Sequence, residues 1–267
     1  MRFGVLSDIH GNLPALEATL SALRRQGVDA YIHLGDLVGY GPFPNECIEV
    51  VAGLESAGVA GNHELILLGR LSPENCWKLA QESLAWTTSV LTADSRAYIE
   101  SLPRRATPAE TVIATHASLK DPEEYIMTTE QAAGQLERLQ HEAPTANLLL
   151  LGHTHRPCAY AFGKGEARLG TDPLSLNNDI WLLNPGSVGQ SRGRRVCATC
   201  MVLDLKRREA TLISLPYDVD RVRRELRRQG LNTNSYHLRS SRLGLLRKAA
   251  QTVVRKVSSS GRGDSPV

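Results

Sequence analysis

The sequence predicts an α/β fold whose first half alternates strands with helices and whose second half is rich in strands. In the first 60 residues, short apolar runs are separated by segments with helical spacing and helix-capping residues. This alternation is typical of a sheet with helices on its faces. From about residue 158 onward, short apolar runs follow one another with glycine-rich turns between them. We find no internal repeat and no long linker before residue 216.

Each element of this pattern is bounded by residues that start or stop regular structure. In the first helix, Asn12 is placed to cap the N-terminus, Pro14 lies in the first turn and Gly27 follows the last turn. We expect helices over residues 14–26, 44–56, 72–92, 95–102 and 129–141. We expect strands over residues 3–7, 30–34, 59–60, 111–115, 148–151, 158–162, 180–183, 197–205 and 210–215.

Composition excludes several classes of protein. Of the 267 residues, 42% are hydrophobic and 22% are charged, which excludes an intrinsically disordered chain. There is no run of 18 or more apolar residues, so we expect no transmembrane segment. The N-terminus lacks a basic segment followed by an apolar one, and a cytoplasmic location is therefore expected. The five cysteines, an odd number spread through the chain, argue against a disulfide framework.

Charge is divided unevenly along the chain. Residues 221–267 contain 12 basic and 2 acidic residues, a net charge of +10, whereas the rest contains 19 basic and 26 acidic residues, a net charge of −7. We therefore expect a main domain over residues 1–215, a basic helical extension over 216–257 and a disordered tail over 258–267.

The basic extension has the pattern of two helices. The first is expected over residues 217–229 and ends before Gly230, and the second has an apolar stripe that includes Leu243, Leu246 and Val253. A basic amphipathic helix of this kind is able to lie on a membrane surface or on nucleic acid. We favour docking on the protein's own body or on a second subunit. A homo-oligomer is therefore compatible with the sequence, and nucleic-acid binding through the tail is the less favoured alternative.

Residues that can bind a metal follow five successive predicted strands. Their side chains are carboxylates, imidazoles and one amide, and they are Asp8, His10, Asp36, Asn62, His116, His153 and His155. In α/β sheets, the carboxyl ends of the strands meet at one edge, where such folds place their sites. In extended chain, residues i and i+2 point to the same side. We therefore expect Asp8 to converge with His10, and His153 with His155.

The chemistry of this set favours two cations. Mixed oxygen and nitrogen ligands suit divalent transition metals such as Mn, Fe, Ni or Zn better than Ca or Mg alone. Seven ligands exceed the number that one ion takes from protein when it keeps an open position. Two ions with a bridging carboxylate fit the set better, and the resulting positive centre would attract a phosphate group.

Five short motifs, in a fixed order, carry a resemblance to a known family. They are Asp8-x-His10, Gly35-Asp36-x-x-x-x-Gly41-Pro42, Gly61-Asn62-His63-Glu64, His116 and Gly152-His153-Thr154-His155. Together, at strand ends, they resemble the motifs of the calcineurin-like metallophosphoesterases. The later stretch Asn184-Pro185-Gly186-Ser187-Val188-Gly189-Gln190 is similar to the small prokaryotic phosphodiesterase branch of that superfamily. The resemblance covers about residues 1–215.

The resemblance implies a four-layer α-β-β-α sandwich with two facing mixed sheets and the site at one end of them. It also implies a ligand set for each ion. The first metal would be held by Asp8, His10, Asp36 and His155, and the second by Asp36, Asn62, His116 and His153. Asp36 would bridge the two ions.

The same resemblance implies a catalytic role for His63. This histidine would not bind metal, and it would protonate the leaving oxygen or stabilise its charge. The nucleophile would be a metal-bridging hydroxide that attacks phosphorus from the face opposite the leaving alkoxide. Glu64 is expected to be an acidic residue in the first turn of a helix, where the dipole favours it.

One departure from the family pattern bears on the substrate. Phosphoprotein phosphatases of the superfamily carry an arginine after the Gly-Asp motif, and Tyr40 stands at that position here. A monoester dianion needs such a bidentate cation more than a diester monoanion does, which favours diesters. Arg192 and Arg194 follow the Asn-Pro-Gly-Ser stretch, and Arg192 is the candidate substrate-binding residue; a surface charge is the alternative interpretation.

The sequence therefore predicts a two-metal phosphoesterase, favouring a phosphodiesterase that acts on small phosphate diesters or nucleotides. Two alternatives within the same chemistry are a phosphomonoesterase and a hydrolase of dinucleoside polyphosphates. A further alternative is a non-catalytic binding module that keeps the fold. The complete ligand set argues against this last alternative. His33, His141 and His237 match no motif and are expected to be structural.

Overall fold

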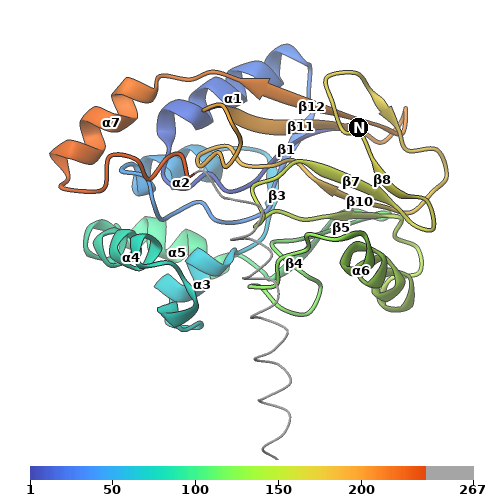
Figure 1. Cartoon of the computed structure of the whole chain (residues 1–267), viewed down its shortest axis with the longest axis horizontal. Helices are drawn as coiled ribbons and strands as arrows, with labels where there is room; N and C mark the ends of the chain where they lie inside the picture. Colours follow the sequence, from blue (N-terminus) through green and yellow to red (C-terminus); the bar gives the residue numbers. More distant parts are fainter. Residues whose placement is uncertain (239–267) are drawn as a thin grey trace, which may run out of the picture.

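The computed structural model describes residues 1–238, which form two six-stranded sheets packed face to face between helices (Figure 1). The first sheet contains β1 (Arg2–Leu6), β2 (Ala30–His33), β3 (Ser56–Gly58), β9 (Leu174–Ser175), β11 (Ala198–Asp204) and β12 (Glu209–Leu215). The second contains β4 (Arg105–Ala109), β5 (Val112–Thr115), β6 (Leu148–Leu150), β7 (Cys158–Ala161), β8 (Gly165–Ala167) and β10 (Trp181–Asn184). The strand orders are β3-β2-β1-β11-β12-β9 and β4-β5-β6-β10-β7-β8.

Both sheets mix parallel and antiparallel pairs. In the first sheet β1 runs parallel to β2 and antiparallel to β11, and in the second β10 runs parallel to β6 and antiparallel to β7. The parallel pairs β1–β2, β2–β3 and β5–β6 join consecutive strands through helical connections, whereas β10 pairs parallel with β6 although only strands and loops lie between them in sequence. The predicted sandwich with two facing mixed sheets is confirmed.

Alternation of side chains along the strands creates the layers. Val5 belongs to the core between the two sheets, whereas the next residue, Leu6, belongs to the core between the first sheet and its helices. Likewise Leu148 and Leu150 face the space between the sheets, and Leu149 packs toward the helix on the outer face of the second sheet. Because every second side chain of a strand points to the same face, continuous apolar strands are buried on both faces.

Helices cover the outer faces of both sheets. The layer on the first sheet includes α1 (Leu13–Arg25) and α2 (Pro44–Ala52), and α6 (Thr129–Glu142) covers the second sheet (Figure 1). Three further helices, α3 (Asn62–Leu67), α4 (Lys78–Val90) and α5 (Ala93–Ser101), occupy the long connection between β3 and β4. As predicted, Asn12 caps α1, because its side-chain oxygen accepts a hydrogen bond from the Ala15 amide.

Several predicted boundaries are wrong, each for a local reason. The helix predicted over 44–56 ends at Ala52, where Gly53 forms its C-cap, and the chain then enters β3. The third strand therefore occupies Ser56–Gly58 rather than 59–60. The helix predicted over 72–92 is split into a 3-10 turn, η1 (Pro73–Asn75), and α4, because Cys76 and Trp77 between them are extended. The bounds of α3 were not predicted, nor were the short strands β4, β8 and β9.

The extension after β12 begins with a helix that packs on the main body. Helix α7 (Val219–Arg228) starts at the capping residue Asp218 and contacts α1. Arg221 Nη1 lies 2.7 Å from Glu17 Oε2 of α1. This agrees with the helix predicted over 217–229. The predicted amphipathic stripe with Leu243 and the predicted tail over 258–267 lie outside the described residues. Within residues 1–238, no helix combines the length and hydrophobicity needed to cross a bilayer.

Candidate metal centre

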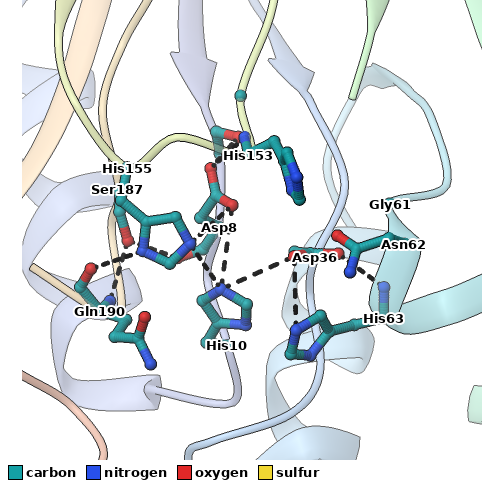
Figure 2. Close-up of polar contacts among 12 residues, drawn as sticks. Asp8, His10, Asp36, Gly61, Asn62, His63, His153, His155, Ser187 and Gln190 are labelled. Atoms are coloured by element: carbon teal, nitrogen blue, oxygen red, sulfur yellow. Dashed lines mark hydrogen bonds and ion pairs between the residues drawn. The ribbon is translucent and has the colours of Figure 1, made fainter. Parts of the chain in front are cut away.

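The loops that follow β1, β2, β3, β5 and β6 bring all seven predicted ligands together at one end of the two sheets. Figure 2 shows His10 joined by dashed lines to the carboxylates of both Asp8 and Asp36. All seven side chains are buried, although they are charged or polar: Asp8, His10, Asp36, Asn62, His116, His153 and His155. Buried polar groups at such density are costly unless they are paired or coordinate a metal.

The backbone at five of these seven ligands is left-handed rather than extended. The φ angles are 54° at Asp8, 50° at His10, 53° at Asp36, 63° at His153 and 57° at His155. The expected convergence is correct for Asp8 and His10, whose Oδ1 and Nε2 atoms lie 3.8 Å apart, whereas His153 and His155 belong to two different ligand groups. The predicted cause, an extended chain, is wrong. Left-handed residues turn the chain sharply, so that each loop presents side chains into the site directly after its strand.

The first group of ligand atoms surrounds Asp8. Asp8 Oδ1 lies 3.1 Å from His155 Nε2 and 3.8 Å from His10 Nε2. Asp8 Oδ2 is fixed by the Ser7 hydroxyl at 2.6 Å and by the His153 backbone N–H at 3.1 Å. These two donors leave Oδ1 buried and without a hydrogen bond among the described residues. Oδ1 is therefore the oxygen that remains for a cation.

The second group is joined to the first through Asp36. Asp36 Oδ2 lies 3.7 Å from His10 Nε2 on one side and 3.4 Å from His116 Nε2 on the other. Asp36 Oδ1 accepts the His63 backbone N–H at 2.9 Å, which fixes the carboxylate in this orientation. The amide oxygen of Asn62 lies 3.0 Å from His116 Nε2. The single atom Oδ2 thus lies between the two groups, as the predicted bridge requires.

Each of the four histidines has one ring nitrogen bonded to a backbone carbonyl. Nδ1 bonds to Val38 O in His10 (3.0 Å), to Leu34 O in His116 (2.6 Å) and to Gln190 O in His155 (2.7 Å); Nε2 bonds to Glu123 O in His153 (3.2 Å). A carbonyl only accepts, so in each ring that nitrogen is the donor, and the other nitrogen of a neutral ring presents a lone pair. In metal sites, a hydrogen bond from the ring nitrogen that does not bind the metal orients the histidine.

Two of these lone pairs point at each other. His10 Nε2 lies 3.1 Å from His155 Nε2, and both rings already donate through Nδ1. Burial lowers the pKa of His10 and of His155, which favours the neutral form of both rings. Two acceptors at this distance repel unless a cation or donor lies beside them. Arg192 Nη2, 3.3 Å from His155 Nε2, is one such group, and His10 Nε2 keeps its lone pair for a metal ion. The donor set therefore fits metal ions.

The pKa values of the carboxylates Asp8 and Asp36 are also lowered, which favours their charged form. Burial alone would raise the pKa of Asp36, but His116 and His63 hold it well below its ordinary value. Burial likewise opposes ionisation of Asp8, and His155 outweighs it, so its pKa is lowered. Both carboxylates are thus ionised, which gives the site the negative charge that divalent cations require. Asp8, His10 and His155 form one group able to hold a metal, and Asp36, His116 and His153 form another.

The predicted catalytic histidine lies at the edge of this set. His63 Nε2 is 3.8 Å from Asp36 Oδ2, and the His63 ring packs against His10 with centroids 4.7 Å apart. His63 Nδ1 faces Gly39, where an added Cβ would lie 2.1 Å from it. Only glycine therefore fits at position 39 without displacing the ring. Tyr40 is buried against both His10 and His63, at centroid distances of 4.8 and 5.1 Å.

Comparison with known proteins identifies the family. Residues 1–208 match the family model described as calcineurin-like phosphoesterase superfamily domain. The chain belongs to the calcineurin-like phosphoesterase superfamily. The family resemblance drawn from the five motifs is confirmed.

Relatives of this phosphoesterase support the assignment. An uncharacterised protein of Methanocaldococcus jannaschii is 32% identical over 221 residues, which cover 80% of this chain and 87% of that protein. The crystal structure of a metallophosphoesterase from Sphaerobacter thermophilus is 32% identical, with a TM-score of 0.76 over 88% of this chain and 97% of the other. A hypothetical protein from Pyrococcus horikoshii shares the fold at 20% identity, with a TM-score of 0.72 over 90% and 99% of the two chains.

The fold also places Arg192 beside the site. Arg192 is 8% exposed, and its Nη2 lies 3.3 Å from His155 Nε2. Its Nη1 is buried and without a hydrogen-bond partner within residues 1–238. Of the two arginines weighed from the sequence, only Arg192 is buried here; Arg194 is exposed. Trp77 lies 5.9 Å from the Arg192 guanidinium.

Sequence reasoning underestimated Glu64. It lies in the first turn of α3, as expected, but its carboxylate also accepts four backbone N–H groups. Oε2 accepts from Asp36 at 2.8 Å and Gly61 at 2.7 Å, and Oε1 from Leu37 at 2.8 Å and Val38 at 3.2 Å. The buried carboxylate thus ties the Asp36 loop to the start of α3. Its place in the Gly61-Asn62-His63-Glu64 motif was the available signal.

Replacing Glu64 with glutamine is expected to weaken metal binding about 10- to 100-fold, because the amide NH₂ cannot accept the backbone N–H groups that orient the Asp36 loop. The free energy of unfolding should also fall by about 1–3 kcal/mol, since buried donors lose their acceptor. Metal titration and chemical denaturation measure the two effects. Glu100→Gln, on the exposed face of α5, is the matched control. Unchanged metal affinity in Glu64→Gln would remove this positioning role.

Proposed function

We propose that this phosphoesterase hydrolyses small phosphate esters, with a preference for diesters, using two divalent transition-metal ions. The observation that carries the proposal is the position of Asp36 Oδ2 between two groups of buried ligands whose histidines are held in the metal-binding orientation. The mixture of imidazole nitrogen and carboxylate oxygen suits Mn, Fe, Ni or Zn.

The proposed ligand sets follow the two groups. The first ion would be held by Asp8, His10, Asp36 and His155, and the second by Asp36, Asn62, His116 and His153. Such a pair of ions supplies a nucleophile derived from water at neutral pH and positive charge for the reacting phosphate. The remaining chemistry belongs to the side chains around them.

Three side chains around the ligands have separate roles in this proposal. His63 donates an N–H to the leaving oxygen and limits the charge that develops there. Arg192 offers its unpartnered Nη1 to a phosphate oxygen. Tyr40, 5% exposed, packs against both His10 and His63 and excludes water from that side.

The proposed preference for diesters rests on the small number of cationic side chains near the ligands. Arg192 is the only lysine or arginine that is buried within residues 1–238. Tyr40 occupies the position at which the phosphoprotein phosphatases carry an arginine. A single guanidinium suits the monoanion of a diester better than the dianion of a monoester.

A panel of phosphate esters tests the proposal on the metal-reconstituted protein. We expect bis(p-nitrophenyl) phosphate to be hydrolysed with a higher kcat/KM than p-nitrophenyl phosphate, and dinucleoside polyphosphates to be poorer substrates than simple diesters. Chelation should abolish each activity and Mn²⁺ should restore it. Faster turnover of the monoester or of a dinucleoside polyphosphate would select the corresponding alternative. A protein that loads two metals but hydrolyses no ester would instead be a binding module.

Arg192→Ala should raise KM for the diester about 10-fold or more, because a charge-assisted contact with the phosphate is lost. kcat should change less, since the ligands remain. Steady-state kinetics with the exposed Arg194→Ala as the matched control measure the difference. An identical KM in both variants would argue that Arg192 does not contact substrate.

A further inference from the structure

The segment that follows α7 reaches back to the candidate metal centre. Residues 231–238, here called the C-terminal strap, lie beyond residue 208, where the match to the family model ends. We propose that the C-terminal strap holds the Arg192 guanidinium in its binding position through Gln190, so that a segment outside the matched family domain completes the substrate site. This inference rests on the proposed function, because it assigns Arg192 to the substrate phosphate.

The strap is bonded to two loops of the site. The Ser235 hydroxyl donates to the Tyr40 carbonyl at 2.8 Å, and the Ser235 carbonyl accepts from Gln190 Nε2 at 3.0 Å. Further along, His237 Nδ1 lies 2.8 Å from the Ser191 hydroxyl, and the Leu238 N–H donates to the Ser191 carbonyl at 3.2 Å. The strap thus contacts the loop that follows Asp36 and the two residues directly before Arg192.

A small apolar core anchors the strap to α7. Tyr236 is 4% exposed and packs with Val222 and Leu226, which are fully buried. The Arg223 guanidinium lies 5.3 Å from the centroid of the Tyr236 ring. Burial of the aromatic side chain holds this short segment against α7. The anchor is remote from the metal ligands in sequence, and its apolar core includes none of them.

Gln190 connects the strap to Arg192. Its side chain is fully buried, and its Oε1 accepts from Arg192 Nε and Nη2, both at 3.3 Å. Because Nε2 is used by the Ser235 carbonyl, the amide can present only its oxygen to the guanidinium. The strap therefore fixes which way the Gln190 amide faces, and the amide fixes the guanidinium.

The result is a guanidinium that keeps one nitrogen unpaired. Gln190 engages Nε and Nη2, and Nη2 also lies 3.3 Å from His155 Nε2, whereas Nη1 has no hydrogen-bond partner among the described residues. The backbone oxygen of Gln190 also accepts a hydrogen bond from His155 Nδ1. Gln190 therefore positions both Arg192 and a proposed metal ligand. A preorganised donor binds an anion more tightly than a mobile one, because less side-chain freedom is lost on binding.

Gln190→Met tests the proposal, since methionine fills a similar volume but makes neither hydrogen bond. In the full-length, metal-loaded protein, we expect KM for the diester to rise about 10-fold, with kcat within about 3-fold of wild type. The affinity for inorganic phosphate, measured by calorimetry, should fall by a similar factor. Metal content should stay unchanged, because the His155 contact is made by the backbone. Gln229→Met, at the end of α7, is the matched control.

A double-mutant cycle separates positioning from general stability. If Gln190 acts through Arg192, adding Gln190→Met to Arg192→Ala should change KM and phosphate affinity less than about 2-fold. Additive losses in the double mutant, or wild-type phosphate affinity in Gln190→Met, would overturn the proposal. Should Gln190→Met fail to fold, Tyr236→Ala releases the strap from its anchor and must weaken phosphate binding in the same way. If wild type binds phosphate but cleaves no ester, the proposed function fails while the phosphate titrations still decide the role of the strap.

Discussion

Asp36→Asn is expected to eliminate turnover, with a loss of at least about 10³-fold, and to reduce bound metal from two equivalents to fewer than one. Asp36 Oδ2 is the atom that faces both ligand groups, at 3.7 Å from His10 Nε2 and 3.4 Å from His116 Nε2. Asparagine can keep the bond that Asp36 Oδ1 accepts from the His63 N–H, but it then presents an NH₂ group where the bridging oxygen stood. A donor at that position repels both cations.

The fold should survive this substitution nearly intact, because the asparagine side chain has the same shape and retains the backbone contact. Metal analysis after dialysis, together with thermal unfolding, measures the two effects separately. Asp94→Asn, exposed in the first turn of α5, provides the control. Two full equivalents of metal in Asp36→Asn would refute the bridging assignment.

His63→Ala is expected to slow esters with poor leaving groups by about 10²- to 10⁴-fold and those with good leaving groups much less. The reason is that an alkoxide leaving group needs an N–H donor, whereas a nitrophenolate does not. Metal content should stay at two equivalents, since His63 Nε2 lies 3.8 Å from Asp36 Oδ2, outside the proposed ligand sets.

A series of aryl and alkyl diesters measures this dependence as the slope of log kcat against leaving-group pKa. The slope should become more negative in His63→Ala than in wild type. His141→Ala, on the exposed face of α6, should leave the slope unchanged. Equal losses across the series would deny His63 the role of donor to the leaving oxygen.

The architecture and the position of the site were accessible from the sequence because both follow from local patterns. Apolar runs and their capping residues mark the strands and helices, and polar residues directly after each run mark the edge where the strands end. Asp8 and His153 are far apart in sequence, yet the Asp8 carboxylate accepts the His153 backbone N–H. Strand order in the two sheets is what brings their loops together.

The features that escaped prediction depend on contacts between distant segments. The role of Glu64 requires that Leu37 and Val38 turn their N–H groups toward it, and no pattern within a single segment reports that. The pairing of Gln190 with Ser235 is likewise set by where α7 packs. Strand β9 has two residues and pairs only with the first two residues of β12. Two residues are too few to show the alternation of apolar and polar side chains that marks a strand.

The left-handed conformation of the ligand loops lowers the free energy of unfolding of the protein. Each non-glycine residue in that conformation opposes folding by about 1 kcal/mol. Substitution by glycine would remove this conformational cost, but it would also remove the side chain that binds the metal. A descendant freed from catalysis should therefore drift toward glycine at Asp8, His10 and His155 and resist heat better than its working ancestor.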